Sequence, residues 1–174
     1  MTILGAILAG GEARRFGSDK ARTLLHGRAL IDHVATALGP HVDAIVTCGR
    51  AYGDLAVLTD LPHEGLGPLG GIAAALDHAD RHGFDRVLTL PCDTPLIEPA
   101  LLEALRACDT PAIVAGCPVI GIWPARLAGQ LIGRLSTEDD RSIMAWARSV
   151  GARRLDVAAP PNINRVTELD RLRG

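Results

Sequence analysis

The chain of 174 residues has very few aromatic side chains and no excess of positive charge. Aromatic residues make up only 3% of the sequence, although hydrophobic residues make up 48%. The core must therefore be aliphatic, and small aliphatic helices packed on Val, Ile and Leu strands are typical of α/β proteins. The formal net charge is −2, so the sequence has no basic field that would indicate a nucleic-acid partner.

Long apolar runs and paired cysteines are also missing. No hydrophobic segment approaches the ~20 residues that span a bilayer, which argues against a membrane partner. The first residues carry no basic stretch ahead of an apolar run, so we expect no secretory signal and a cytoplasmic location. The cysteines form no C-x-x-C pair, which disfavours zinc and favours free thiols; they are Cys48, Cys92, Cys108 and Cys117.

Short apolar segments alternate with amphipathic ones along the chain. Strands are predicted at residues 3–8, 44–47, 55–58, 86–90, 112–115, 119–122 and 153–157. Helices are predicted at residues 29–38, 72–79, 98–107, 125–135 and 142–150, and a Thr-x-x-acid pattern predicts one more from Thr167. We therefore expect one domain, residues 1–174, of the α/β class with a doubly wound, mostly parallel, Rossmann-like sheet. Ligands should bind at the carboxyl edge of that sheet.

The segment after the first predicted strand combines glycines with two cations. Gly10 and Gly11 let backbone N–H groups approach phosphate oxygens closely, and Arg15 and Lys20 add positive charge. Lys20 is the only lysine of the chain, which singles the position out. The segment is neither a P-loop nor a G-x-G-x-x-G fingerprint. We favour phosphate binding here over an ordinary surface turn.

Asp93 directly follows another buried strand. A carboxylate at this position suits Mg²⁺ held against phosphates, but Asp-Thr-Pro is also common turn chemistry, and the residue alone leaves the two interpretations even. Residues 67–71 form a second glycine-rich segment, for which a tight turn is the simpler interpretation. His78 and His82 have helical spacing for a metal pair, but their polar surroundings favour a solvated helix end.

Asn162 and Asn164 lie two apart in a stretch that follows two prolines. In an extended segment their amides would point to the same side, where they could bind Mg²⁺ or a polar ligand. A plain loop before the last helix is the simpler interpretation of these residues taken alone.

Together these motifs resemble the NTP transferases that act on the molybdenum cofactor. The specific ones are Leu8-Ala9-Gly10-Gly11, Arg15-Phe16-Gly17 with Asp19-Lys20, and Leu90-Pro91-Cys92-Asp93-Thr94-Pro95; the supporting ones are Gly67–Gly71 and Asn162-Ile163-Asn164 with Glu168-Leu169. They follow in the family's order over nearly the whole chain. Within that family the chain is most similar to the guanylyltransferases, because two glycines follow Leu-Ala where cytidylyl relatives carry Leu-Ala-Ala-Gly.

This resemblance implies transfer of GMP from GTP to the phosphate of a molybdopterin-type cofactor, with release of pyrophosphate. It implies that the nucleotide is bound by Leu8, Ala9, Gly10, Lys20, Asp60 and Asp93, with main-chain groups near the first three contacting the base. It implies Mg²⁺ as cofactor on Asp93, with catalysis by Arg15, Lys20 and Asp93. Acceptor binding is implied for Arg141, Asn162 and Asn164. Molybdoenzymes or cofactor-insertion proteins are the implied protein partners.

Some positions depart from the family pattern. Thr47 and Cys117 stand where the family often has Asn and His, and Arg165-Val166 replaces Thr-Pro. Two alternatives therefore stay open. One is a cytidylyl- or sugar-phosphate nucleotidyltransferase of the same fold, and the other is a non-catalytic nucleotide-binding regulator. Retention of Lys20 and Asp93 argues against the regulator.

Overall fold

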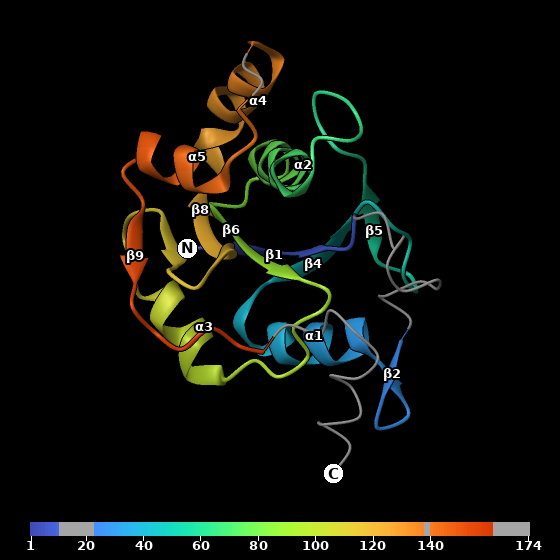
Figure 1. Ribbon diagram of the computed structural model, residues 1–174. Helices are drawn as coiled ribbons and strands as arrows, with labels where there is room; N and C mark the ends of the chain where they lie inside the picture. Colours follow the sequence, from blue (N-terminus) through green and yellow to red (C-terminus); the bar gives the residue numbers. More distant parts are fainter. Residues whose placement is uncertain (11–22, 138–139, 162–174) are drawn as a thin grey trace.

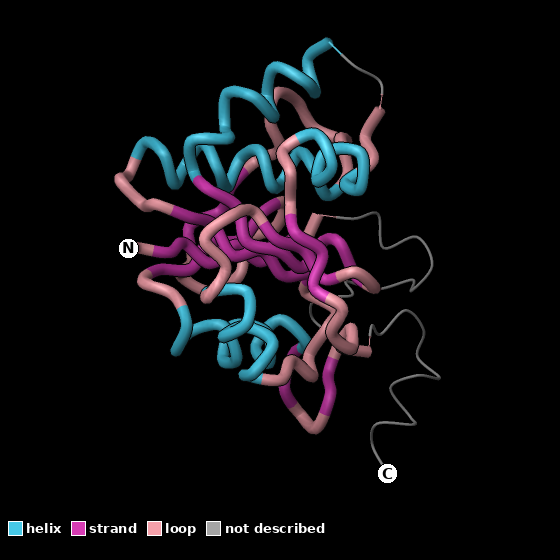
Figure 2. The backbone as a smooth tube through the Cα atoms, turned by 90° about the vertical axis from the view of Figure 1, so that its left-hand side faces the viewer, coloured by secondary structure: helices cyan, strands magenta, loops and turns pink. Residues whose placement is uncertain are grey.

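The computed structural model describes residues 1–10, 23–137 and 140–161. Its centre is a seven-stranded sheet in the order β5-β4-β1-β6-β8-β7-β9, covered by helices on both faces (Figures 1 and 2). The strands are β1 (Ile3–Leu8), β4 (Ala44–Cys48), β5 (Ala56–Leu58), β6 (Arg86–Pro91), β7 (Ala112–Val114), β8 (Cys117–Pro124) and β9 (Arg153–Leu155). The expected α/β class with a mostly parallel sheet is confirmed.

Two helical layers enclose the sheet, as Figure 2 shows. The helical segments are α1 (Leu30–Leu38), η2 (Gly39–His41), α2 (Pro68–Arg81), α3 (Pro99–Arg106), η3 (Ala125–Leu127), α4 (Ala128–Thr137) and α5 (Ile143–Ser149). One hydrophobic cluster lies between the sheet and α2, α4 and α5, and a second lies between the sheet and α1 and α3. Both faces of the central strands are therefore buried, which explains why those strands are continuous apolar runs in the sequence.

The central strand β1 shows how the side chains divide between the layers. Leu4, Ala6 and Leu8 belong to the cluster under α2, whereas Ile3 and Ile7 belong to the cluster under α1. Successive side chains of a strand point to opposite faces, so an all-apolar strand serves two cores at once. This double burial fixes β1 in the middle of the sheet and fixes the place where its carboxyl end emerges.

The strand order reverses at β1. The chain runs from β1 outward to β4 and β5, and then returns to β6 on the other side of β1; all of these strands are parallel. At such a reversal the loops from neighbouring strands lead away in opposite directions and leave a crevice at the carboxyl edge. The segments that follow β1, β4, β5 and β6 all meet this edge.

The strand β8 is antiparallel to both of its neighbours, β6 and β7. Only residues 115 and 116 separate β7 from β8, and a connection this short allows a hairpin but no parallel crossover. The reversal brings Trp123 over the sheet, where its indole Nε1–H donates to the Thr89 hydroxyl oxygen at 3.2 Å. Thr89 in turn donates to the Val119 carbonyl at 2.7 Å, so this buried polar group is satisfied.

Two local features differ from the sequence-based expectation. A small hairpin of β2 (Leu24–Leu25) and β3 (Arg28–Ala29) precedes α1, turning through His26 and Gly27 with φ of 50° and 77°. Helix α2 begins at Pro68, four residues earlier than expected, because proline at the first helical position is well tolerated. The helix expected from Thr167 lies outside the described residues.

Candidate nucleotide site at the carboxyl edge of the sheet

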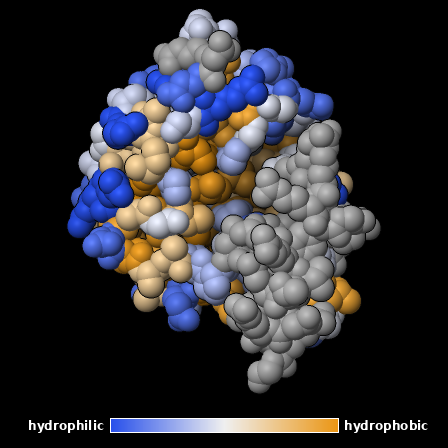
Figure 3. All heavy atoms as spheres, viewed as in Figure 1, coloured by the Kyte–Doolittle hydropathy of each residue, from blue (hydrophilic) through white to orange (hydrophobic). Residues whose placement is uncertain are grey.

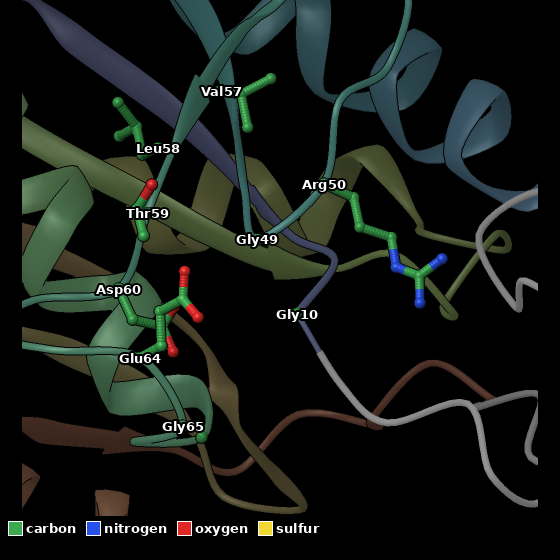
Figure 4. Close-up of a pocket in the computed structure, with 10 residues that line it drawn as sticks. Gly10, Gly49, Arg50, Val57, Leu58, Thr59, Asp60, Glu64 and Gly65 are labelled. Atoms are coloured by element: carbon green, nitrogen blue, oxygen red, sulfur yellow. The ribbon is translucent and has the colours of Figure 1, made fainter.

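A cavity of about 600 Å³ opens at the carboxyl edge beside β1, β4 and β5. Its size is ordinary for a small-molecule site. Figure 4 shows most of the residues that line it: Gly10, Gly49, Arg50, Val57, Leu58, Thr59, Asp60, Glu64, Gly65 and Gly67. They come from the end of β5 and from the segments that follow β1, β4 and β5, three neighbouring parallel strands, so the sheet itself assembles this site.

Gly10 and Gly49 both line the cavity and lie between Arg50 and the two carboxylates in the view of Figure 4. A Cβ built on Gly49 would lie 2.6 Å from the Gly10 Cα, and Gly49 has a φ of 90°. Any side chain there would both clash and strain the backbone. The Ala9 N–H also donates to the Cys48 carbonyl at 2.9 Å, so the ends of β1 and β4 are held together.

Asp60 and Glu64 form an acidic wall on one side of the cavity (Figure 4). The pKa of Asp60 is raised, first by burial and to a smaller extent by the negative charge of Glu64. Hydrogen bonds from the backbone of Leu66 and Gly65 oppose this rise in the pKa. The Asp60 carboxylate is therefore tied to the loop that leads into α2.

Helix α2 leaves just enough space for Asp60. A Cβ built on Gly70 would lie 2.8 Å from both the Cβ and the Cγ of Asp60. Gly70 and Gly71 lie within the first turns of α2. Because Gly70 has no side chain, the side chain of Asp60 can pack directly against the helix at this point. The sequence favoured a tight turn here, but both glycines lie inside the helix. A Cβ built on Gly71 would lie 3.1 Å from the Cys48 Cβ, so the helix also packs closely against β4 at this point.

The same loop receives a hydrogen bond from a residue that is distant in the sequence. The Arg141 guanidinium donates to the Gly65 carbonyl at 3.0 Å, across 76 positions of sequence. Arg141 directly precedes Ser142, whose hydroxyl caps α5 by accepting the Ala145 N–H at 3.2 Å. The approach to α5 therefore borders the cavity, and the exposed guanidinium lies near its acidic wall.

Asp93 emerges after β6, on the side of β1 opposite to β4. The Cys92 N–H donates to the Leu8 carbonyl at 3.1 Å, and the Thr94 hydroxyl donates to the Pro91 carbonyl at 3.0 Å. These bonds fix the backbone on both sides of Asp93. Burial raises the pKa of the Cys117 thiol, and the negative charge of Asp93 raises it further, so the start of β8 lies next to this carboxylate.

A carboxylate oxygen in this position suits a hard cation. Among the described residues no three His, Cys, Asp or Glu side chains gather closely enough to hold a metal ion by themselves. Mg²⁺ commonly uses one or two carboxylates together with phosphate oxygens, so Asp93 fits a site that a nucleotide completes. His78 and His82 stack with ring centroids 4.0 Å apart, and His82 Nδ1 is already paired with the His78 carbonyl at 2.8 Å.

The structure brings together part of the expected nucleotide site. Gly10 and Asp60 both line the cavity, and Leu8 and Ala9 lie buried directly before Gly10. The Leu8 carbonyl and the Ala9 N–H already take part in hydrogen bonds with Cys92 and Cys48. Four expected residues lie outside the described part of the chain: Arg15, Lys20, Asn162 and Asn164.

Gly49, Arg50 and Glu64 line the cavity but were not expected as site residues. The sequence did contain a signal for the first two, because they directly follow a predicted parallel strand and must therefore reach the same edge as Gly10. Glu64 had no such signal. Its position depends on how the segment between β5 and α2 folds back over the edge.

The surface in the view of Figure 3 combines apolar and polar areas. Hydrophobic residues gather in its hollowed middle, and hydrophilic residues border them above and on the left. Such a combination is common where small molecules bind. Among the described residues, no helix is both long and apolar enough to cross a bilayer.

The architecture and the cavity at the strand-order reversal are those of a nucleotide-binding α/β protein. Residues 5–156 match the model of the MobA-like NTP transferase domain. A molybdenum cofactor guanylyltransferase from Cereibacter sphaeroides is 35% identical, with 97% of both chains covered. One from Acidiphilium cryptum is 34% identical, covering 94% of this chain and 90% of the other. The chain therefore belongs to the MobA-like NTP transferase family.

Solved structures agree with this fold. A structure described as molybdopterin-guanine dinucleotide biosynthesis protein A from Archaeoglobus fulgidus has a TM-score of 0.74 at 24% identity, covering 98% of this chain and 96% of that one. A nucleotidyl transferase from Methanothermobacter thermautotroptrophicus has a TM-score of 0.76 at 20% identity, with coverages of 99% and 96%. At these identities the similarity concerns the fold.

Proposed function

We propose that this protein transfers GMP from GTP to the terminal phosphate of a molybdopterin-type cofactor and releases pyrophosphate. One observation supports this most strongly. In a chain of the MobA-like family, a cavity with polar walls lies at the strand-order reversal, and the Asp93 carboxylate emerges after the strand on the other side of β1. One nucleotide can therefore extend from the cavity to the carboxylate.

The charges indicate which way the nucleotide lies. Asp60 and Glu64 would repel phosphates, but they can accept hydrogen bonds from the hydroxyl and amino groups of a nucleoside. The nucleoside therefore occupies the cavity, and the triphosphate extends past Gly10 toward Asp93. This orientation directs the α-phosphorus toward the carboxylate that would hold Mg²⁺.

The transfer itself is an in-line displacement. An oxygen of the acceptor's phosphate forms a bond to the α-phosphorus of GTP, while the bond from that phosphorus to the bridging oxygen of the β-phosphate breaks. The leaving pyrophosphate keeps the bonding electrons. Such reactions depend on positioning and charge neutralisation more than on a side-chain acid or base.

The residues divide this work between them. Asp93 would hold Mg²⁺ against the phosphates, and that ion supplies positive charge to their oxygens when it is bound. Arg15 and Lys20 would stabilise the charge that accumulates on the leaving pyrophosphate. Arg141, which already reaches the edge of the cavity, would bind the acceptor's phosphate together with Asn162 and Asn164. This reaction would take place in the cytoplasm. Molybdoenzymes or cofactor-insertion proteins would then receive its product.

The test measures pyrophosphate release with molybdopterin-type acceptor, Mg²⁺ and each of GTP, CTP and ATP. GTP should give the highest kcat/KM, and removing divalent cations with a chelator should abolish turnover until Mg²⁺ is restored. Faster turnover with CTP would identify a cytidylyltransferase, and turnover only with a sugar phosphate would identify a different acceptor class. Nucleotide binding without turnover on either acceptor would favour a regulator.

A further inference from the structure

Glu64 occupies an unusual position on the wall of the cavity. It lies in the segment between β5 and α2, it is exposed, and Figure 4 shows its carboxylate directed into the cavity above that of Asp60. Among the described residues, none donates a hydrogen bond to the Glu64 carboxylate. Its oxygens are therefore available to a molecule that enters the cavity.

The neighbouring carboxylate of Asp60 determines which kind of ligand group Glu64 can bind favourably. Asp60 is already bound by the backbone of Leu66 and Gly65, and the charge of Glu64 acts on it unfavourably. A ligand that donates hydrogen bonds to Glu64 would spread that charge and reduce the repulsion between the two groups. A ligand that presents acceptors at the same place would increase the repulsion. The wall therefore selects for hydrogen-bond donors.

The nucleobases differ in just this property. Guanine presents N1–H and the N2 amino group side by side, and two parallel donors match the two oxygens of one carboxylate. Adenine and cytosine present a ring-nitrogen acceptor at the corresponding edge. The Asp60 carboxylate is already hydrogen-bonded by the backbone of Leu66 and Gly65. Of the two carboxylates that line the cavity, Glu64 is therefore the one whose oxygens can accept both donors of the base.

We propose that Glu64 is a specificity-determining residue that binds the N1–H and N2–H₂ edge of guanine with its two carboxylate oxygens. This inference depends on the proposed function to the extent that the nucleoside of GTP must occupy this cavity. It assigns the choice among nucleotides to one side chain in the segment before α2 and leaves the transfer step to residues near Asp93.

The test uses ITP as a probe, because hypoxanthine keeps N1–H but lacks the 2-amino group of guanine. Dissociation constants for GTP and ITP are measured calorimetrically with Mg²⁺ for the wild type, Glu64→Gln and Glu64→Ala. The wild type should bind GTP about tenfold or more tightly than ITP, as expected for one charge-assisted hydrogen bond. Glu64→Gln keeps one acceptor and should reduce this ratio, and Glu64→Ala should bring it close to one.

Glu103→Gln provides the matched control, because this exposed glutamate lies in α3, away from the cavity, and its change should leave the ratio as in the wild type. An unchanged GTP-to-ITP ratio in Glu64→Ala overturns the inference. An equal loss of affinity for both nucleotides, with an unchanged Tm, overturns it too, because Glu64 would then support the cavity without selecting the base. Failure of the wild type to bind any NTP would instead contradict the proposed function.

Discussion

Asp60 is the residue where three parts of the site meet: the end of β5, the loop before α2 and the first turn of α2 itself. Its carboxylate is hydrogen-bonded by the loop backbone, and its Cβ and Cγ fill the space that Gly70 leaves open. An aspartate fits at position 60 because position 70 is a glycine.

Gly70→Ala should consequently behave unlike an ordinary helical substitution. The new methyl group would lie 2.8 Å from the Asp60 Cβ, so either α2 or the aspartate must move. We expect a loss of about 1–3 kcal/mol in the free energy of unfolding, typical of overpacking, together with weaker GTP binding. Urea denaturation and calorimetry measure the two effects.

Gly133→Ala is the matched control for that change. Gly133 also lies inside a helix, α4, but a Cβ there would meet no atom within 4 Å. The replacement should therefore stabilise the protein by about 0.5–1 kcal/mol, as Gly-to-Ala changes in open helical positions do. If Gly70→Ala stabilised the protein as much as Gly133→Ala, the contact with Asp60 would contribute nothing to the free energy of unfolding.

Asp93→Asn should remove most of the activity and leave the fold intact. The change keeps the size of the side chain and removes the negative charge that would hold Mg²⁺. We expect turnover to fall by about 100-fold or more, with a Tm close to that of the wild type. Asp109→Asn, on an exposed loop after α3, is the control that should remain active. Near-normal turnover of the Asp93 variant at low Mg²⁺ would exclude this residue from the mechanism.

Among the elements, the approach to α5 and the loop before α2 are connected by Arg141. Arg141→Ala should reduce transfer to the acceptor about tenfold or more, because a charged donor to phosphate is lost. GTP affinity should change by less than about threefold, since the bond to Gly65 is a single exposed hydrogen bond. A transfer assay and calorimetry on the same variant separate the two effects.

Arg148→Ala, on the exposed side of α5, is the control for the removal of one positive charge. It should leave both transfer and GTP binding unchanged. If Arg141→Ala weakened GTP binding as much as it weakened transfer, the role of Arg141 would be to hold the nucleotide loop, and the acceptor would bind elsewhere.

The elements also show which features of the fold were predictable from sequence. Strands such as Ile3–Leu8 were found because burial on both faces makes them continuous apolar runs. The β2–β3 hairpin was missed because its strands have only two residues each, too short for any periodicity to be detected. The early start of α2 was missed because glycine normally indicates a loop, whereas here Gly70 and Gly71 are required in the helix to make room for a neighbouring side chain.

The site was predictable to the extent that it follows strand ends. Gly10 and Asp60 were identified by resemblance, and their place beside a cavity agrees with their position after parallel strands. Glu64 could not be predicted, because no periodic pattern describes the path of the segment before α2. The expected roles of Arg15, Lys20, Asn162 and Asn164 stay predictions.

For the molecule as a whole, the acidic wall has an energetic cost that depends on pH. Burial raises the pKa of Asp60, so the folded state holds this proton more tightly than the unfolded state does. The free energy of unfolding therefore decreases as the pH rises from the ordinary carboxyl pKa through the raised folded-state pKa. The burial that holds this carboxylate in the cavity wall therefore lowers the stability of the fold once the carboxylate is ionised.

Asp60→Asn should accordingly make the nucleotide-free protein more stable at neutral pH, while GTP binding becomes weaker. The gain in stability should shrink as the pH is lowered, because the raised pKa of Asp60 makes the folded wild type take up this proton more readily than an ordinary carboxylate does. Urea unfolding at neutral and at acidic pH gives the comparison. Lower stability of the variant at neutral pH would mean that the hydrogen bonds from Gly65 and Leu66 outweigh the burial of the charge.

The two-residue turn between β7 and β8 has a consequence for how this molecule can change. The antiparallel course of β8 places this turn at the same edge as the ends of β6 and β1, next to Asp93 and Cys117. Lengthening a surface loop costs little free energy, since the closure entropy grows only slowly with length. An insertion after residue 115 could therefore build a new wall over the Asp93 side of the site, while the cavity beside β4 and β5 stays as it is. If the proposed function holds, acceptor preference can thus diverge between descendants of this fold without any change in the cavity proposed for the nucleoside.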